Sequence, residues 1–64
     1  MKVQKRWGAR EILKFRKAHG MQQSELAERL GIGQSYISQL EAGDKVPSKT
    51  LCLLLNCLAK ELDG

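Results

Sequence analysis

The sequence predicts an all-α fold, a compact bundle of four to five short helices. The chain has 64 residues, which is room for one small domain. Its apolar residues recur at helical spacing, and almost no segment alternates polar and apolar residues as a strand does. Glycines and a proline divide the chain into the short segments that would form these helices: Gly8, Gly20, Gly31, Gly33, Gly43, Pro47 and Gly64.

Residues 1–8 are expected to form a flexible basic arm ahead of the folded domain, which would cover residues 9–64. The arm holds Arg6, a candidate for contact with a phosphate, and Trp7, which could anchor the arm to the domain. Two interpretations of the arm stay open. It could follow a DNA groove or the phosphates, or it could serve only as a solubilising tail.

The first helix is expected over residues 9–19, with Ile12, Leu13 and Phe15 toward the core. His19 falls in its last turn, where a cationic side chain interacts favourably with the helix dipole. We therefore interpret His19 as structural rather than catalytic.

Two more helices are expected over residues 23–30 and 34–42, joined by the tight connection Gly31-Ile32-Gly33. Gly31 suits the left-handed residue that ends the first of them, and Gly43 does the same for the second. Two short helices with such a turn match the helix-turn-helix arrangement, in which the second helix enters the major groove of DNA.

The helix over residues 34–42 has a wide polar side without charge. At about 100° per residue, Tyr36, Leu40 and Ile37 fall within a narrow apolar arc. Exposed faces of stable helices usually carry Glu, Lys and Arg, so a plain solvated face is the less favoured alternative. Gln can bond to adenine and Ser to several base edges, so this polar side is typical of a helix that reads DNA. It consists of Gln34, Ser35, Ser38, Gln39 and Ala42.

The last segment, residues 49–62, is expected to form one helix or two, with Ser48 as the N-cap. Its leucines recur at i, i+3, i+4, i+7 and i+11, which is the spacing of a core-facing stripe. The expected core of the whole domain is Ile12, Leu13, Phe15, Met21, Leu26, Ala27, Leu30, Ile37, Leu40, Leu51, Leu54, Leu55 and Leu58.

The net charge is +4, and it is concentrated at the start of the chain. Residues 1–20 carry seven basic side chains against one acidic side chain. This asymmetry favours a polyanionic partner, with nucleic acid ahead of an anionic membrane. No apolar run approaches the ~20 residues of a membrane span, and no signal segment follows the basic start. The chain is expected to be cytoplasmic, without membrane contact.

The sequence does not indicate a metal site or a cofactor site. Cys52 and Cys57 would point about 140° apart on one helix, which makes a disulfide between them implausible. His19 is the only histidine, so a Cys/His zinc site and a Cys/His catalytic pair are both implausible. The cysteines are interpreted as small buried hydrophobes, with an intersubunit contact as the alternative. No cofactor and no enzymatic activity are expected.

The run FRKAHGMQQSELAERLGIGQSYISQLEAG, residues 15–43, resembles the Cro/CI-type helix-turn-helix regulators, also called Xre-like. The resemblance covers roughly residues 9–58 and implies a lambda-repressor-like DNA-binding domain that acts as a symmetric dimer. The matching elements are Arg16, the run Gln23-Ser24-Glu25-Leu26-Ala27, Gly31, Ile37-Ser38, Leu40-Glu41 and Gly43.

The resemblance also implies roles for individual residues. Gln34, Ser35 and Gln39 match positions that read bases, and Ser38 shares their face of the helix. Gln23 and Tyr36 match positions that contact the phosphate backbone, and Arg16 and Glu41 are implied to form an ion pair. Two departures from the family pattern are Gln22 and Gly33, which stand where a Ser or Thr usually caps a helix. The loop after Gly43 is also about one residue shorter than is common, and we favour Lys45 and Lys49 as its phosphate contacts, the latter helped by the start of the last helix.

The last helix carries apolar residues outside its core stripe. Leu53 and Cys57 fall on the opposite side of the helix from Leu51, and a 64-residue chain has little left with which to cover them. With Leu62, they are expected to form part of a dimer interface, the alternative being a broad core face.

The leading hypothesis is therefore a dimeric repressor that reads a short palindromic operator in double-stranded DNA, with autoregulation as one option. The alternative is an antitoxin that binds a toxin and represses its own operon, because the ending KTLCLLLNCLAKEL is similar to Hip-type antitoxins. A protein partner, either a toxin or another regulator, belongs to that alternative.

Overall fold

The computed structural model describes residues 7–63, which form four α-helices and, within this range, no strand. The predicted all-α fold is confirmed, and the last segment is one helix rather than two. The helices are α1 (Ala9–Ala18), α2 (Gln23–Leu30), α3 (Gln34–Ala42) and α4 (Lys49–Asp63).

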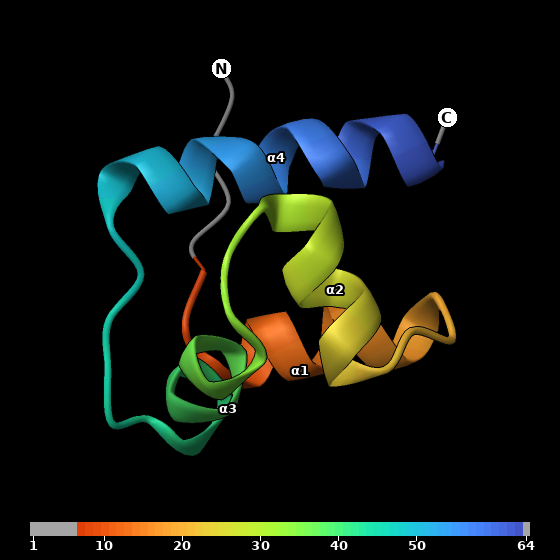
Figure 1. Cartoon of the computed structure of the whole chain (residues 1–64). Helices are drawn as coiled ribbons and strands as arrows, with labels where there is room; N and C mark the ends of the chain where they lie inside the picture. Colours follow the sequence, from red (N-terminus) through yellow and green to blue (C-terminus); the bar gives the residue numbers. More distant parts are fainter. Residues whose placement is uncertain (1–6, 64) are drawn as a thin grey trace.

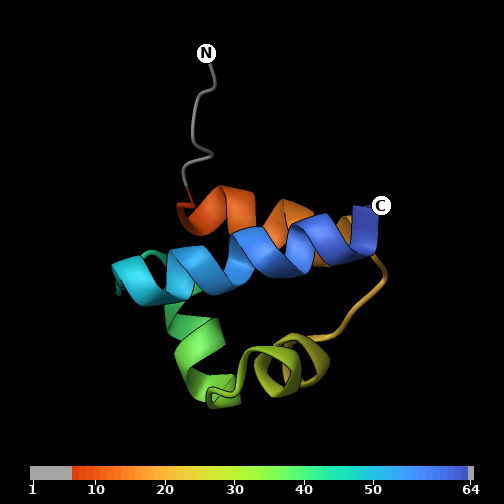
Figure 2. The ribbon, with the colours of Figure 1, turned by 90° about the horizontal axis from the view of Figure 1, so that it is seen from above.

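The long helix α4 lies along one side of the bundle, and α3 lies on the opposite side (Figure 1). When the molecule is seen from above, α1 lies on one side of α4, and α2 and α3 lie on the other (Figure 2). The segment between α3 and α4 crosses from one side of the bundle to the other without helical structure. This arrangement leaves the outer faces of α3 and α4 pointing away from each other.

The turn between α2 and α3 depends on Gly31. Its φ of 74° is in the left-handed region, which side chains with a Cβ rarely adopt. The amide of Ile32 then donates to the carbonyl of Ala27 over 2.9 Å and closes the end of α2. The tight turn fixes the direction in which α3 leaves α2.

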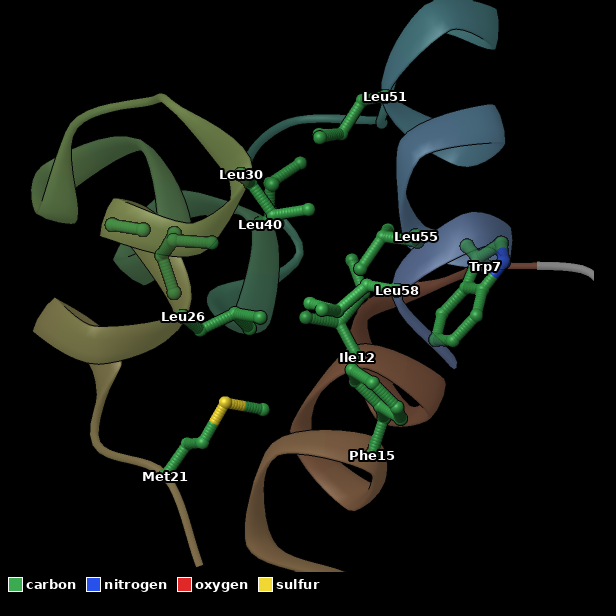
Figure 3. Packing of buried hydrophobic residues seen from close by; sticks show 12 residues of the cluster. Trp7, Ile12, Phe15, Met21, Leu26, Leu30, Leu40, Leu51, Leu55 and Leu58 are labelled. Atoms are coloured by element: carbon green, nitrogen blue, oxygen red, sulfur yellow. The ribbon is translucent and has the colours of Figure 1, made fainter. Parts of the chain in front are cut away.

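The core lies between the helices, and the side chains of all four contribute to it (Figure 3). Ile12, Leu26, Ile37, Leu40 and Leu55 are fully buried. Fully burying such a side chain stabilises the fold by about 1.5–3 kcal/mol. The whole buried set is Trp7, Ile12, Phe15, Met21, Leu26, Ala27, Leu30, Ile37, Leu40, Leu51, Leu55 and Leu58.

Two residues of the expected core lie elsewhere. Leu13 is half-buried, and Leu54 is 42% exposed. Each directly adjoins a fully buried residue, Ile12 or Leu55, and successive side chains on a helix point about 100° apart. The stripe that packs inward is narrow, so Leu13 and Leu54 lie on the flank of their helices.

Trp7 is part of the core, so the arm expected over residues 1–8 does not include it. Its side chain is 5% exposed, and its ring packs edge-on against Phe15 with the centroids 5.4 Å apart. The indole Nε1 donates to Asn56 Oδ1 over 2.8 Å, which links the residue to α4. Arg6 lies outside the described residues.

The ends of α1 and α4 are also joined. His19 Nε2 lies 2.9 Å from Asp63 Oδ1, and His19 Nδ1 lies 3.0 Å from the carbonyl oxygen of Phe15. At the other end of α4, the amide of Leu51 donates to Ser48 Oγ over 3.1 Å, so Ser48 is the N-cap that the sequence predicts.

Candidate nucleic-acid interface

The outer face of α3 is polar and carries no charge. Gln34, Ser35, Ser38 and Gln39 are all exposed, and none of these side chains has a hydrogen-bond partner within residues 7–63. We call these four residues the polar face of α3. Their donors and acceptors are available to an outside partner.

The inner face of α3 holds the helix firmly in place. Ile37 and Leu40 are fully buried, and Tyr36 is partly buried against the core. Gly33 precedes the helix in an extended conformation without a side-chain cap. The low helix propensity of the outer residues is therefore offset by packing rather than by capping.

Both predicted lysines are exposed, and they lie at the two ends of the segment between α3 and α4. Lys45 adjoins the end of α3, where its amide and that of Asp44 donate to the carbonyl of Gln39 over 3.4 and 2.9 Å. Lys49 is the first residue of α4. These cationic side chains lie close in sequence to the polar face.

Arg16 of α1 and Glu41 of α3 form a bidentate ion pair. Arg16 Nε donates to Glu41 Oε2 over 2.7 Å, and Arg16 Nη2 donates to Glu41 Oε1 over 2.9 Å. The side chains are only 14% and 7% exposed. Arg16 Nη1 also donates to the carbonyl of Met21 over 3.1 Å, so one guanidinium ties α1, α3 and the turn before α2 together.

The pair shifts the pKa of both partners toward their charged forms. For Arg16, the hydrogen bond to Glu41 raises the pKa above its ordinary value and outweighs burial. Burial by itself would raise the pKa of Glu41. Hydrogen bonds from Arg16 and Gln23 and the charges of Arg16 and Lys17 outweigh that effect, so the pKa of Glu41 is lowered. The carboxylate is charged but neutralised locally by Arg16.

Gln23 contacts Glu41, a bond that sequence reasoning missed. Gln23 Nε2 donates to Glu41 Oε1 over 3.1 Å, and the side chain is half-buried at the first position of α2. The resemblance assigned Gln23 to the phosphate backbone and Glu41 to Arg16, and no sequence pattern joined the two. Only the packing of α2 against α3 brings them together.

The outer side of α4 has exposed apolar side chains beside the charged Lys60 and Glu61. Leu53 is 52% exposed, Leu54 is 42% exposed and Cys57 is exposed, so the interpretation of the cysteines as buried hydrophobes is wrong for Cys57. We call these three residues the apolar patch of α4. Leu62, which the sequence placed in the same interface, is instead partly buried against the core of its own chain, because it continues the stripe of Leu51, Leu55 and Leu58.

Within residues 7–63, no three His, Cys, Asp or Glu side chains lie together in a way that could hold a metal ion. Every helix in the same range is too short or too polar to span a membrane.

Comparison with known proteins agrees with this geometry. A family model described as helix-turn-helix matches residues 12–63, a range that begins in α1 and ends with α4. A search of the curated proteins and a search of the solved structures each found no match. The matched range includes α2, the Gly31 turn, α3 and both partners of the ion pair. The chain belongs to the Cro/CI-type, Xre-like helix-turn-helix family of DNA-binding regulators.

Proposed function

We propose that the protein is a transcriptional repressor that binds a short palindromic operator as a symmetric dimer. The observation that carries the proposal is the polar face of α3: exposed, uncharged side chains on a helix whose inner side chains are fully buried. Such a helix presents hydrogen-bonding groups at fixed positions, which is what the reading of base edges needs.

In the docking geometry of this motif, α3 enters the major groove while α2 crosses the phosphate backbone. Gln34, Ser35, Ser38 and Gln39 then face the bases. Glutamine side chains bond well to the N6 and N7 of adenine, so the half-site is expected to contain A·T pairs opposite Gln34 and Gln39.

The groups proposed to contact phosphate surround this helix. Lys45 and Lys49 adjoin the end of α3 and the start of α4, Gln23 starts α2, and Tyr36 lies at the edge of the polar face. The acidic residue of α3, Glu41, is paired with Arg16, so it does not oppose the approach of phosphate. Arg6 is a further candidate on the basic side of the chain.

The apolar patch of α4 is the proposed dimer contact. A small domain gains stability by covering exposed leucines with a second copy of itself. Leu53 and Cys57 remain in this proposal, Leu54 joins them, and Leu62 leaves it. A two-fold dimer would read half-sites about 34–36 Å apart, one turn of the DNA helix.

Selection of bound sites from a random DNA pool tests the specificity. The recovered sites should share a palindrome, and their affinity should exceed that of scrambled duplexes of equal composition by roughly a thousandfold or more. Equal affinity for the selected and scrambled duplexes would contradict the proposal. A reporter gene placed behind the selected site should lose expression when the protein is present, whereas a gain would show an activator.

A further inference from the structure

The start of α2 and the end of α3 meet at one carboxylate. Glu41 Oε1 accepts a hydrogen bond from Gln23 Nε2 over 3.1 Å and another from Arg16 Nη2 over 2.9 Å. Glu41 Oε2 accepts from Arg16 Nε over 2.7 Å. With three donors and a side chain only 7% exposed, the carboxylate has one well-defined position.

This contact fixes the orientation of the Gln23 amide. A carboxylate can only accept hydrogen bonds, so Gln23 must turn its NH₂ group, rather than its oxygen, toward Glu41. The NH₂ group has two hydrogens, and the bond to Glu41 uses one of them. Gln23 is half-buried, so the second hydrogen remains within reach of an outside acceptor.

The backbone around Gln23 offers further donors. Gln22 precedes α2 without a side-chain cap, and the first hydrogen bond within the helix runs from the amide of Leu26 to the carbonyl of Gln22. The amides of the residues between them have no acceptor within the helix. These donors carry the positive end of the helix dipole, which favours an anion.

The charge of Glu41 does not prevent an anion from approaching. Arg16 neutralises it in a bidentate pair, and the charge of Lys17 also acts on it. Arg16 further donates to the carbonyl of Met21 over 3.1 Å, which holds the turn that leads into α2. The network can therefore hold the Gln23 side chain and its backbone without placing a net negative charge beside them.

We propose that Glu41 is a positioning residue for DNA binding: it orients the amide of Gln23 so that the second N–H donates to a DNA phosphate. The inference rests on the proposed DNA-binding function and adds a role for Glu41 beyond its ion pair. Because Glu41 belongs to α3 and Gln23 to α2, the contact sets the polar face of α3 at a fixed distance from the phosphate backbone.

A double-mutant cycle on DNA affinity tests the proposal. The variants are Gln23→Ala, Glu41→Gln and both together, measured with the selected duplex and with a scrambled duplex. Each affinity is expressed per folded molecule, using the folded fraction from circular dichroism at the same temperature. Glu28→Gln is the matched control, since Glu28 is an exposed carboxylate on α2 that contacts neither Gln23 nor Arg16.

Gln23→Ala should weaken binding about tenfold on both duplexes, the effect of losing one hydrogen bond to a charged group. Glu41→Gln should also weaken DNA binding, although removing a negative charge on its own strengthens binding to DNA. Glu28→Gln should show that strengthening. In the Gln23→Ala background, Glu41→Gln should cause no further loss. The proposal is overturned if Glu41→Gln weakens DNA binding equally in the unaltered chain and in the Gln23→Ala variant. It is also overturned if Glu41→Gln causes no loss of affinity per folded molecule.

A second measurement uses the unaltered chain and does not depend on whether Glu41→Gln folds. In a ¹⁵N NMR spectrum, one side-chain N–H of Gln23 should exchange slowly with water before DNA is added. The resonance of the second Gln23 side-chain proton should shift when the selected duplex is added. The side-chain amide of Gln22, which is exposed, should exchange rapidly in the free protein and serves as the control. Rapid exchange of both Gln23 protons and no shift on binding would refute the role of Glu41.

The same experiments separate this inference from the proposed function. If the unaltered chain does not prefer the selected duplex, the proposed function fails and this inference fails with it. If the preference is present but the cycle shows no coupling between positions 23 and 41, only this inference is lost.

Discussion

The outer faces of α3 and α4 are both exposed, yet the uncharged side chains that they present have opposite chemistry. The polar face of α3 offers the amides and hydroxyls of Gln34, Ser35, Ser38 and Gln39. The apolar patch of α4 offers Leu53, Leu54 and Cys57. The polar face of α3 lacks the Glu, Lys and Arg that the surface of a stable helix usually carries, whereas α4 has Lys60 and Glu61 beside its apolar patch.

The comparison shows two different uses of exposed uncharged side chains. A face that reads base edges needs groups that both donate and accept hydrogen bonds. A face that joins another protein needs apolar area that leaves water on association. Since α3 and α4 lie on opposite sides of the bundle (Figure 1), each face can be altered without touching the other.

Glu41→Ala should have the largest effect, because it removes the support of α3 but touches nothing in α4. It leaves the guanidinium of Arg16, which is only 14% exposed, without its partner. Stranding such a charge is expected to lower the free energy of unfolding by about 3–5 kcal/mol. Urea unfolding followed by circular dichroism measures the loss. Glu28→Ala, at an exposed position of α2, should stay within about 0.5 kcal/mol of the unaltered chain.

The next largest effect is expected on the apolar patch. Leu53→Glu should weaken the proposed dimer by about 2 kcal/mol, roughly a 30-fold rise in its dissociation constant, because a charge would be buried in the contact. Sedimentation equilibrium measures the constant. Lys14→Gln, on the outer side of α1, makes the same change in net charge away from the patch. If Leu53→Glu and Lys14→Gln sediment alike, the patch is not the dimer contact.

The sequence predicted the polar face well because its information is local. A helix over residues 34–42 with Ile37 and Leu40 on its inner side determines which side chains point outward, and the structure has this helix. The same local argument predicted Ser48 as a cap and glycines as helix ends. Family resemblance added Arg16 and Glu41, which are 25 residues apart and which no helical period connects.

The sequence predicted the apolar patch less well because helix α4 is leucine-rich on most sides. A wheel gives the direction of each side chain but not the width of the face that its neighbours cover. For this reason Leu54 was expected in the core and Leu62 in the interface. In the structure, Leu62 continues the buried stripe, and Leu54 lies on the exposed flank of the helix. Trp7 was expected as an anchor of the arm but not as a core residue, and its bond to Asn56 was not predicted because the two are 49 residues apart in the chain.

On the polar face, Gln39→Ala should change the base preference, whereas Lys49→Ala at the start of α4 should not. Loss of a base contact costs about 1–3 kcal/mol against the preferred base and relaxes choice at one position. Loss of a phosphate contact weakens all duplexes about equally and lowers the salt slope by about 1. Titrations of single-base operator variants at several salt concentrations separate the two. If both variants weaken binding to every duplex equally, Gln39 does not contact a base.

The smallest effect is expected from acid, and it acts through the support of α3 rather than through either outer face. The pKa of Glu41 is lowered from its ordinary value of 4.5 in the folded chain, while burial alone would have raised it. The unfolded chain therefore takes up this proton more readily than the folded chain. The stability that Glu41 contributes is complete above its unfolded pKa, and it is lost as the pH falls through the folded pKa.

Urea unfolding of the unaltered chain and of Glu41→Gln, repeated from pH 7 down to pH 3, measures this contribution. The difference between their unfolding free energies should be constant above about pH 5 and should shrink as the pH falls. Other carboxylates titrate in both proteins and cancel in the difference. A difference that stays constant down to pH 3, or that grows, would show that the carboxylate of Glu41 is not stabilised by its contacts with Arg16 and Gln23. The support of the polar face would then come from Ile37 and Leu40 alone.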